Sequence, residues 1–592
     1  MPPAAATLPA RIDTRAFLWL LVILSLATLN APQDIWDTIR HLRVPDTDDA
    51  MRLVEVRDLL AGQPWYDNVQ YRFLAPEGVA SHWSRLVDAP IAALIGALTP
   101  LAGRPLAEGL IAAFWPVLLF GLYCTLLYRG VRRTFGGRAA ILAVLVATQT
   151  FGIAIQFQPG RVDHHNVQIL AMLGLAFCLM RGCFPAAFVG GGLAALSLAV
   201  GLEGLPYLAL AALYYVGDWC WRGRPALPGL ASFGVGLGVA APLLFAAPTA
   251  PTLWTATRCD ALSPPWLWLA AGGFGFALAA TALRRRLGTP GSRIALAILC
   301  GILLIGGFGL AFPICLEGPF PGMTPLVRDH WLLTVNEMAS LPKSVAQGRW
   351  EMLVFYPVVL IGSLTATWMA WRGPQRRAWS IAALFLWPGL ILGVFQFRGL
   401  YIASGFVPLV AAPVIDRALT RAAAPGTAVR RWGALALGSG LVSTVWLAPM
   451  ALAGWIAPAS RTAPDSAGVI ACQGDAAVRP LAALPPGTVL APIFLGPSIL
   501  LRTPHTIVAA PYHRAIPGLT AAIEGLGGTE ADLDRVLDTF QVRYLVTCPS
   551  RPADDLQATP AFATRLTRGD AHTDRLEPVT VPGPLKVWRV VR

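Results

Sequence analysis

Apolar segments of about 20 residues recur along this chain, and they limit its possible folds more than any other feature. They extend from residue 17 to residue 455, and a helix of about 20 apolar residues crosses the ~30 Å hydrocarbon core of a bilayer. Only 13% of the 592 residues are charged, about half of the ~25% found in soluble domains. The sequence therefore predicts an α-helical polytopic membrane protein. The thirteen expected spans are residues 16–31, 105–128, 138–156, 166–180, 184–200, 204–221, 227–247, 265–283, 294–313, 352–371, 378–395, 399–415 and 432–455.

The net charge of +13 comes from arginines that gather in alternate short loops. These loops hold Arg129, Arg132, Arg133 and Arg138; Arg181; Arg222 and Arg224; Arg284, Arg285, Arg286 and Arg293; Arg372, Arg376 and Arg377; and Arg417, Arg421, Arg430 and Arg431. Cytoplasmic loops carry such an excess of basic residues, so the charge indicates topology and requires no nucleic-acid partner. With Arg11 and Arg15 before the first span, the N-terminus is expected in the cytoplasm. We expect a multi-pass protein of the inner or plasma membrane, with a periplasmic or extracellular C-terminal domain.

The predicted membrane domain covers residues 1–456 and includes two long outer loops, 32–104 and 312–350. Residues 457–592 contain strand-like runs at 488–491 and 542–547 and a predicted helix at 530–540, which together indicate a small α/β domain. The nine cysteines lack zinc-binding spacing, and most are expected to be packing residues. Cys472 and Cys548 lie in the outer domain, where they could pair; the sequence leaves this open.

Polar groups beside a membrane are costly and are therefore candidates for function. The first such group is Asp46, Asp48 and Asp49, followed by an amphipathic helix expected at residues 50–61. Aspartate is a favoured helix cap, and this is the alternative role, although one aspartate would be enough for it.

The second group is residues 160–166, which include Arg161, Asp163, His164 and His165. In an extended segment the side chains of Asp163 and His165 project to the same side, and a carboxylate with an imidazole can hold a divalent cation. The alternative is a simple loop in which Asn166 caps the next span.

Two further groups are single ionisable residues on the same predicted side. Glu337 lies in the second outer loop, where it could equally be an ordinary loop residue. Arg398 lies at the outer end of two spans, where the topology disfavours arginine. It could bind a phosphate, or its side chain could simply extend to the membrane interface. Other possible site residues are His82, Arg85, His505 and His513.

These four groups, in this order, resemble the motifs of the catalytic subunit of oligosaccharyltransferases, in the GT-C superfamily. Asp48 and the helix after it are similar to the first-loop aspartate of that family. The segment Asp163-His164-His165 resembles its second acidic motif, in the form found in archaeal members. The run ending in Glu337 resembles the Ser-Val-Ser-Glu-type motif of the large flexible loop, and the segment from Arg398 to Tyr401 resembles the segment that meets the lipid-linked phosphate.

The resemblance implies a GT-C-like fold and transfer of a sugar or oligosaccharide from a polyprenyl phosphate or diphosphate donor, with inversion. Asp48, Asp163 and His165 would bind a divalent cation, Mn²⁺ or Mg²⁺, and Asp48 would be catalytic. Arg398 would contact the donor phosphate, and Glu337 would close over the acceptor.

One expected motif is missing. The Trp-Trp-Asp-Tyr-Gly signature, which recognises serine or threonine in the acceptor sequon of that family, does not occur, and Trp588 is the only tryptophan after Trp455. The acceptor is therefore left open between a protein, a lipid and a glycan.

Two alternatives of other classes remain open: a transporter or flippase for lipid-linked intermediates, and a non-catalytic protein that binds them. A transporter requires polar or broken helices at the middle of the membrane. The expected spans are mostly apolar, with Glu203 the main exception, and the polar groups gather on one side. This pattern favours the enzyme.

Overall fold

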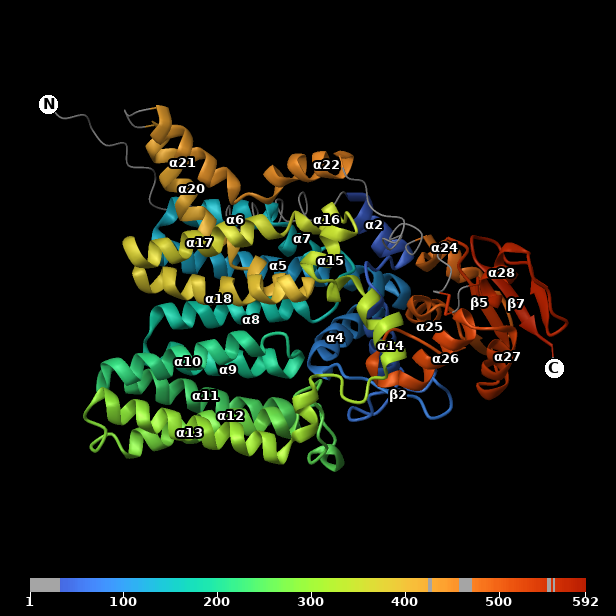
Figure 1. The fold of residues 1–592 in the computed structure, drawn as a ribbon, viewed down its shortest axis with the longest axis horizontal. Coiled ribbons are helices and arrows are strands. Elements are labelled where there is room, and N and C mark those ends of the chain that lie inside the picture. The colour runs from blue at the N-terminus through green and yellow to red at the C-terminus, as the bar shows by residue number, and fades with distance from the viewer. Residues whose placement is uncertain (1–31, 424–427, 457–470, 551–554, 557–558, 592) are drawn as a thin grey trace.

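The structure is a computed structural model that describes residues 32–423, 428–456, 471–550, 555–556 and 559–591, so the first predicted span and Arg11 and Arg15 lie outside the described residues. Long helices run side by side, and a smaller α/β domain lies at one end of them (Figure 1). The long helices are α5 (Arg104–Phe135), α8 (His165–Arg181), α9 (Phe184–Val200), α10 (Leu205–Arg222), α11 (Leu227–Ala246), α12 (Pro264–Ala282), α13 (Pro290–Ala311), α17 (Tyr356–Arg372) and α18 (Arg376–Phe395).

Helices long and apolar enough to cross a membrane account for most of the predicted spans. In the described part of the chain there are seven by length and composition, or up to nine if each of two bent pairs is one span. One pair is α6 (Gly137–Gln149) with α7 (Phe151–Phe157), bent by 70°, and the other joins α19 (Leu400–Ser404) to α20 (Val407–Ala423), bent by 55°. The helices α8 and α9 are apolar but shorter. The chain is therefore a multi-pass membrane protein.

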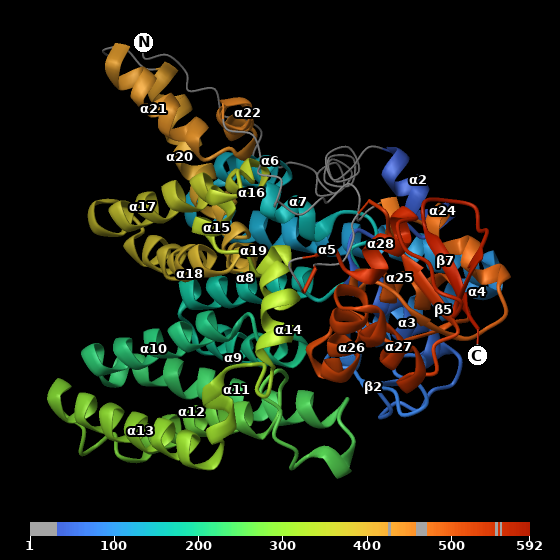
Figure 2. The same cartoon turned by 45° about the vertical axis from the view of Figure 1, so that its right-hand side comes forward.

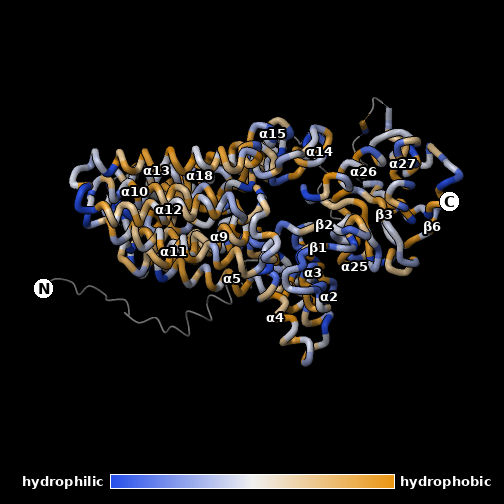
Figure 3. Tube along the Cα trace, turned by 90° about the horizontal axis from the view of Figure 1, so that it is seen from below, coloured by the Kyte–Doolittle hydropathy of each residue, from blue (hydrophilic) through white to orange (hydrophobic). Residues whose placement is uncertain are grey.

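The structure differs from the prediction at two places. The last predicted span, 432–455, is wrong as a continuous helix, because it divides into α21 (Ala428–Gly440), a short 3₁₀ turn and α22 (Leu447–Ile456). The break follows a Gly-Ser-Gly sequence, and each glycine is about 1 kcal/mol less favourable than alanine in a helix. The second difference is α4 (Arg85–Ala102), which has the length and composition of a span although it lies in the first predicted outer loop. Figure 3 shows α4 at a steep angle to the bundle.

The arginine-rich turns lie together at one end of the bundle. The helices α10 and α17 end in Arg222 and Arg372, α18 begins with Arg376, and residues 284–286 lie between α12 and α13. In Figures 1 and 2 the α/β domain lies at the opposite end. This separation agrees with the positive-inside pattern, in which basic turns share the cytoplasmic side.

We expect positions 285 and 574 to lie on opposite sides of the membrane. Both side chains are exposed, so a single cysteine at either position is open to reagents, provided that the five free cysteines are first replaced by alanine. A membrane-impermeant maleimide added to intact cells should label position 574 and leave position 285 unlabelled until the membrane is opened. Equal labelling of the two positions in intact cells would contradict this topology.

The first outer loop folds into α2 (Pro32–His41), α3 (Thr47–Leu60), β1 (Val69–Gln70), β2 (Val79–Ala80) and α4. The predicted helix at 50–61 begins earlier, at Thr47, because the carboxylate of Asp46 accepts a hydrogen bond from the Thr47 amide at 2.6 Å and caps the helix. The capping role is thus real for Asp46. Asp48 and Asp49 lie in the first turn, where they are not the cap.

The second outer loop forms short helices that contact the C-terminal domain. These are η3 (Pro313–Glu317), α14 (Pro325–His330), η4 (Leu332–Thr334), η5 (Asn336–Met338) and α15 (Leu341–Ala346). Val327 and Trp331 form a small apolar cluster with Leu519 and Ile523 of the domain. This packing holds the loop against the domain, and Glu337 lies a few residues beyond the contact.

The C-terminal domain contains a five-stranded sheet in the order β4-β3-β5-β7-β6. Its strands are β3 (Thr488–Leu490), β4 (Thr506–Ile507), β5 (Tyr544–Thr547), β6 (Leu576–Val579) and β7 (Lys586–Val590), and its helices include α25 (Gly496–Arg502), α26 (Ile516–Gly527), α27 (Glu530–Thr539) and α28 (Phe562–Arg568). β3 is parallel to β4 and β5, whereas β7 is antiparallel to β5 and β6. The predicted strands at 488–491 and 542–547 and the predicted helix at 530–540 are confirmed within a few residues.

Two disulfides are present in the described residues. Cys472 pairs with Cys548, which resolves the question that the sequence left open. Cys259 pairs with Cys315 and joins the loop before α12 to the start of the second outer loop. The expectation that cysteines outside the tail are packing residues is therefore wrong for this pair. The two cysteines are 56 residues apart in the sequence, and only the fold brings them together.

Candidate functional site

A cavity of about 780 Å³ lies between the end of the helical bundle and the C-terminal domain. Both outer loops, the ends of several long helices and the C-terminal domain contribute to its walls. Its polar lining residues include Asp46, Asp48, His82, His164, Glu203, Asp260, Glu337, Arg398 and His513. Four distant parts of the sequence thus meet here, and most of the predicted site residues are among them.

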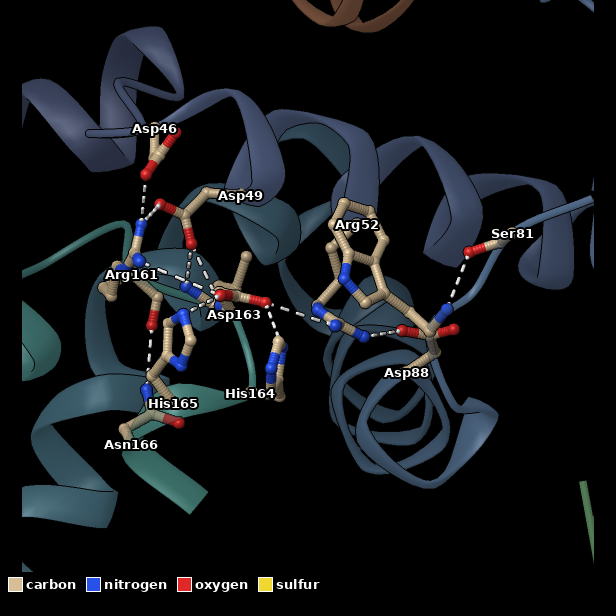
Figure 4. A network of polar contacts seen from close by, with 12 residues as sticks. Asp46, Asp49, Arg52, Ser81, Asp88, Arg161, Asp163, His164, His165 and Asn166 are labelled. Atoms are coloured by element: carbon tan, nitrogen blue, oxygen red, sulfur yellow. Dashed lines mark hydrogen bonds and ion pairs between the residues drawn. The ribbon is translucent and has the colours of Figure 1, made fainter. Parts of the chain in front are cut away.

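Arg161 is the centre of a buried carboxylate network directly behind the cavity wall (Figure 4). Its guanidinium contacts Asp46 at 3.0 Å and Asp49 at 3.1 Å. It lies 3.7 Å from Asp163 and 3.8 Å from Glu337. Burial alone would lower the pKa of Arg161, but these carboxylates outweigh it and raise the pKa well above its usual range. One arginine therefore joins three of the four predicted motifs.

Asp49 has a structural role in this network. Its Oδ1 accepts hydrogen bonds from the backbone amides of Val162 at 2.8 Å and Asp163 at 2.9 Å. Its side chain is fully buried, so it is not a wall of the cavity. Asp49 thus fixes the backbone of the second motif against α3.

Arg52 is a second buried arginine at the site, and the sequence analysis missed it. It donates to Asp88 Oδ1 at 2.6 Å and to Asp163 Oδ1 at 3.3 Å, and all three side chains are fully buried (Figure 4). The signal that could have found it is an arginine six residues after the cap Asp46, one helical turn from Asp48, Asp49 and Glu55. Because buried charges are costly unless paired, this arginine indicates a nearby carboxylate.

The Asp163-His164-His165 segment is a turn into α8, so the expectation of an extended segment is wrong. His164 has α-helical backbone angles and immediately precedes α8, which begins at His165. The proposed cap Asn166 instead donates from its side-chain amide to the Arg161 carbonyl at 3.1 Å. The turn still brings Asp163 and His165 together, because His165 Nε2 lies 3.5 Å from Asp163 Oδ2.

The two oxygens of Asp163 have different environments. Oδ1 accepts from Arg52 and lies 2.7 Å from His164 Nδ1, whereas Oδ2 has no hydrogen-bond partner among the described residues. Burial alone would raise the pKa of Asp163, but His164, His165 and Arg161 outweigh it and hold the pKa well below its usual range. Oδ2 is therefore an ionised, buried oxygen beside an imidazole nitrogen.

The donor atoms of Asp163, His164 and His165 lie within 4.8 Å of one another. Two ligand atoms that are each about 2.1 Å from one cation are roughly 3–3.5 Å apart, and the Oδ2 to Nε2 distance of 3.5 Å is close to this range. A mixed oxygen and nitrogen set suits Mn²⁺ or Zn²⁺, and it suits Mg²⁺ less well. The residues present therefore fit a divalent cation. Asp48 is not part of this compact group.

Asp48 faces the cavity from the first turn of α3. In the described part of the chain its carboxylate makes no side-chain hydrogen bond. Burial and the nearby carboxylates of Asp46, Asp163 and Glu337 raise the pKa of Asp48 well above its usual range. A bound cation would offset the repulsion between these carboxylates and would stabilise the ionised form of Asp48.

Glu203 and Arg398 extend the polar site along the cavity wall. Glu203 Oε2 lies 3.4 Å from His164 Nε2, and Glu203 Oε1 lies 4.0 Å from Arg398 Nη1. Burial alone would lower the pKa of His164, but Asp163 and Glu203 raise it to about 10. The sequence analysis noted Glu203 only as an exception among apolar spans and did not place it in the site.

Glu337 reaches the site from the second outer loop. Its carboxylate accepts a hydrogen bond from the Tyr401 hydroxyl at 2.9 Å, and Tyr401 belongs to the same predicted segment as Arg398. The third and fourth motifs therefore contact each other directly, and Glu337 also links the third motif to Arg161.

Two of the possible site residues lie away from the cavity. Arg85 is buried and donates to the Asp67 carbonyl at 2.6 Å and to Gln63 Oε1 at 3.0 Å. His505 is buried in the C-terminal domain, where its Nε2 lies 2.8 Å from the Leu481 carbonyl oxygen. Both contacts are internal, and neither residue lines the cavity.

The fold can be compared with known proteins at this point. No protein-family model and no curated protein match the chain by sequence. Among solved structures, the chain has the fold of a class of archaeal membrane proteins, the oligosaccharyltransferases.

Several of the matching structures are of the oligosaccharyltransferase of Archaeoglobus fulgidus. Its apo form aligns with a TM-score of 0.67 and 14% identity, over 90% of this chain and 69% of that chain. AglB of the same organism, in complex with an inhibitory peptide and a dolichol-phosphate, aligns at 0.65 and 14% identity over the same shares. The complex with Zn and sulfate aligns at 0.60 and 14% identity, over 90% of this chain and 67% of that chain. The predicted polytopic helical fold with a C-terminal α/β domain is confirmed, and it is the fold of these oligosaccharyltransferases.

Proposed function

We propose that this protein is a membrane glycosyltransferase that takes a sugar or oligosaccharide from a polyprenyl phosphate or diphosphate donor. The observation that supports it most is one cavity lined by Asp48, His164 and Arg398, with the candidate cation ligands Asp163 and His165 packed against His164. In a lipid-linked sugar a phosphate is bonded to the anomeric carbon. A cation and an arginine are both groups that bind a phosphate.

The solved structures with this fold support the proposal. One of them is a complex with a dolichol-phosphate and another is a complex with Zn and sulfate, that is, a lipid-linked phosphate in one case and a metal with a tetrahedral anion in the other. This chain has the same fold and has residues of suitable chemistry at one end of its helical bundle. We propose an active site on the outer side of an inner or plasma membrane, with the C-terminal domain periplasmic or extracellular.

The proposed roles follow from position and chemistry. Asp163 and His165 would hold Mn²⁺ or Mg²⁺, with Asp48 as a further ligand from the opposite wall. When bound, such a cation neutralises charge on a leaving phosphate. Arg398 would bind the same phosphate, because guanidinium groups form paired hydrogen bonds with phosphate oxygens.

Glu337 would contact the acceptor, and its position depends on Tyr401 and Arg161. The acceptor would attack the anomeric carbon from the side opposite the lipid phosphate, which inverts that centre. Arg52 and Arg161 would not touch the substrate. They hold Asp163 and the carboxylates around it in place, so we regard them as positioning residues.

Metal removal and a substitution at Asp48 test the proposal. Full-length protein in lipid nanodiscs, given tritium-labelled polyprenyl-linked glycan and the membrane extract of its native host, should consume donor and release polyprenyl phosphate. EDTA should reduce the rate at least ~100-fold, since a catalytic cation contributes several kcal/mol. Mn²⁺ should restore the rate better than Mg²⁺, because histidine is a ligand. Asp48→Asn should cause a comparable loss.

Asp574→Asn is the matched control, since its side chain is fully exposed. Donor consumption that is unaffected by both EDTA and Asp48→Asn would contradict the proposal. Tight donor binding without consumption would instead support the non-catalytic alternative, and movement of intact donor across the membrane would support a flippase.

A further inference from the structure

A second polar cluster lines the cavity, and the proposed donor chemistry does not use it. Asp260, in the loop before α12, lies 2.6 Å from His513 Nε2 and accepts hydrogen bonds from Arg514 at 2.7 and 3.0 Å. Arg514 also donates to the Ser81 carbonyl. Three segments that are distant in the sequence are thus joined at one place. The Asp260 carboxylate is already paired with His513 and Arg514.

His82 is the member of this cluster that remains available to a ligand. It lines the cavity, and within the described ranges its ring makes no hydrogen bond or ion pair. Its position is fixed by ring packing, with centroids 4.8 Å from His513 and 4.9 Å from Trp83. Both ring nitrogens are thus without a protein partner in the described part of the chain, on a residue that lines the cavity.

The charged groups around His82 favour its neutral form. Burial lowers the pKa of His82, and His513, Arg514 and His164 lower it further, whereas Asp260 acts in the opposite direction. The balance keeps the pKa well below its usual value. A neutral imidazole can accept a proton at neutral pH.

The cluster is next to the donor side of the cavity. The Tyr512 ring lies 6.3 Å from that of His82, and the Tyr512 hydroxyl donates to the Thr47 carbonyl at 3.1 Å. Thr47 immediately precedes Asp48. Tyr512 therefore links the cluster to the segment that carries Asp48, and both His82 and Asp48 line the cavity.

The edge of the C-terminal sheet that leads to this cluster is already covered. Strand β4, which leads into Tyr512, already pairs with residues 72–74: the Leu74 amide donates to Ile507 and the Ile507 amide donates to Arg72, both at 2.9 Å. Peptides that bind by adding a strand need an unpaired edge. The lining instead offers rings, including Phe320, which packs on His513 with centroids 4.5 Å apart. Such apolar faces beside a neutral polar group suit a sugar, which has C–H faces and hydroxyls.

We propose that this end of the cavity is the acceptor subsite, that its acceptor is a sugar hydroxyl, and that His82 takes the proton of that hydroxyl. The inference rests on the proposed function. In the step, the hydroxyl oxygen forms the new bond to the anomeric carbon, the bond from that carbon to the lipid phosphate breaks, and its electron pair leaves with the phosphate. The hydroxyl proton moves to His82.

The test compares acceptors, with protein in nanodiscs, Mn²⁺ and labelled polyprenyl-linked glycan. The acceptors are p-nitrophenyl glycosides of glucose, galactose, mannose and N-acetylglucosamine, a Ser/Thr peptide, and an Asn-x-Thr peptide with its Asn-x-Ala partner. We expect transfer to at least one glycoside and background transfer to all peptides. His82→Gln should lower kcat by about 10²-fold or more with KM changed less than about threefold, as for loss of a general base. Added imidazole should partly restore His82→Gly.

The control is His572→Gln, since His572 is an exposed histidine on the C-terminal domain. Transfer to a peptide, or donor consumption with no glycoside accepted, would overturn the assignment of the acceptor. An unchanged kcat in His82→Gln would overturn the role of His82. Both results leave the proposed donor chemistry intact, whereas a protein that neither binds nor consumes donor in any arm refutes the proposed function and this inference with it.

Discussion

Replacement of Asp163 by asparagine is expected to abolish sugar transfer and to destabilise the outer part of the protein. The substitution keeps the shape of the side chain and removes its charge. Arg52, at 3.3 Å, and His164, at 2.7 Å, then lose their ionised partner. Breaking a buried ion pair on one side costs about 3–5 kcal/mol, and loss of a cation ligand should lower the rate by about 10³-fold. Initial rates of donor consumption and thermal unfolding in nanodiscs measure the two effects.

Asp88→Asn provides a matched control for the same network. Asp88 is fully buried and contacts Arg52 at 2.6 Å, but it does not line the cavity. This variant should lose stability to a similar extent and keep most of its activity at a temperature at which it remains folded. If the two variants lose activity equally, Asp163 serves the fold and does not bind the cation.

Replacement of Arg161 by methionine is expected to have an equally large effect on stability. Methionine has a similar length and no charge, so the carboxylates of Asp46, Asp49, Asp163 and Glu337 would face one another without their common partner. We expect a loss of about 3–5 kcal/mol, together with detachment of the second outer loop, since Glu337 loses one of its two anchors. Thermal unfolding and limited trypsin cleavage at the exposed Arg328 should both report the change.

Arg575→Met is the comparison for Arg161, because Arg575 forms a surface pair with Asp534 at 3.4 Å. Surface pairs contribute about 0–1 kcal/mol, so this variant should resemble the wild type. An Arg161→Met protein as stable as the Arg575 variant, and equally resistant to trypsin, would show that the buried network is not needed to hold the loop.

The membrane architecture and the order of the site motifs could be predicted from the sequence. Hydrophobic length and basic turns are local properties, because the bilayer acts on each segment separately. Helix propensity is also a local property, so Gly-Ser-Gly at residues 438–440 predicts a break in the last span. Asp48, Glu337 and Arg398 were identified because an ionisable residue near a membrane is costly and stands out in an apolar sequence.

The contacts that make the site were decided only by the tertiary structure. Arg52 meets Asp163 across 111 positions of the chain, and Arg514 meets Asp260 across 254. No local pattern encodes these pairs, because they form when helices and loops pack and bury charges that must then find partners. The same packing turned an expected extended segment at Asp163 into a helical turn and still brought Oδ2 of Asp163 to His165. The sequence by itself determined which residues face the outer end of the bundle, and the tertiary structure decided which of them touch.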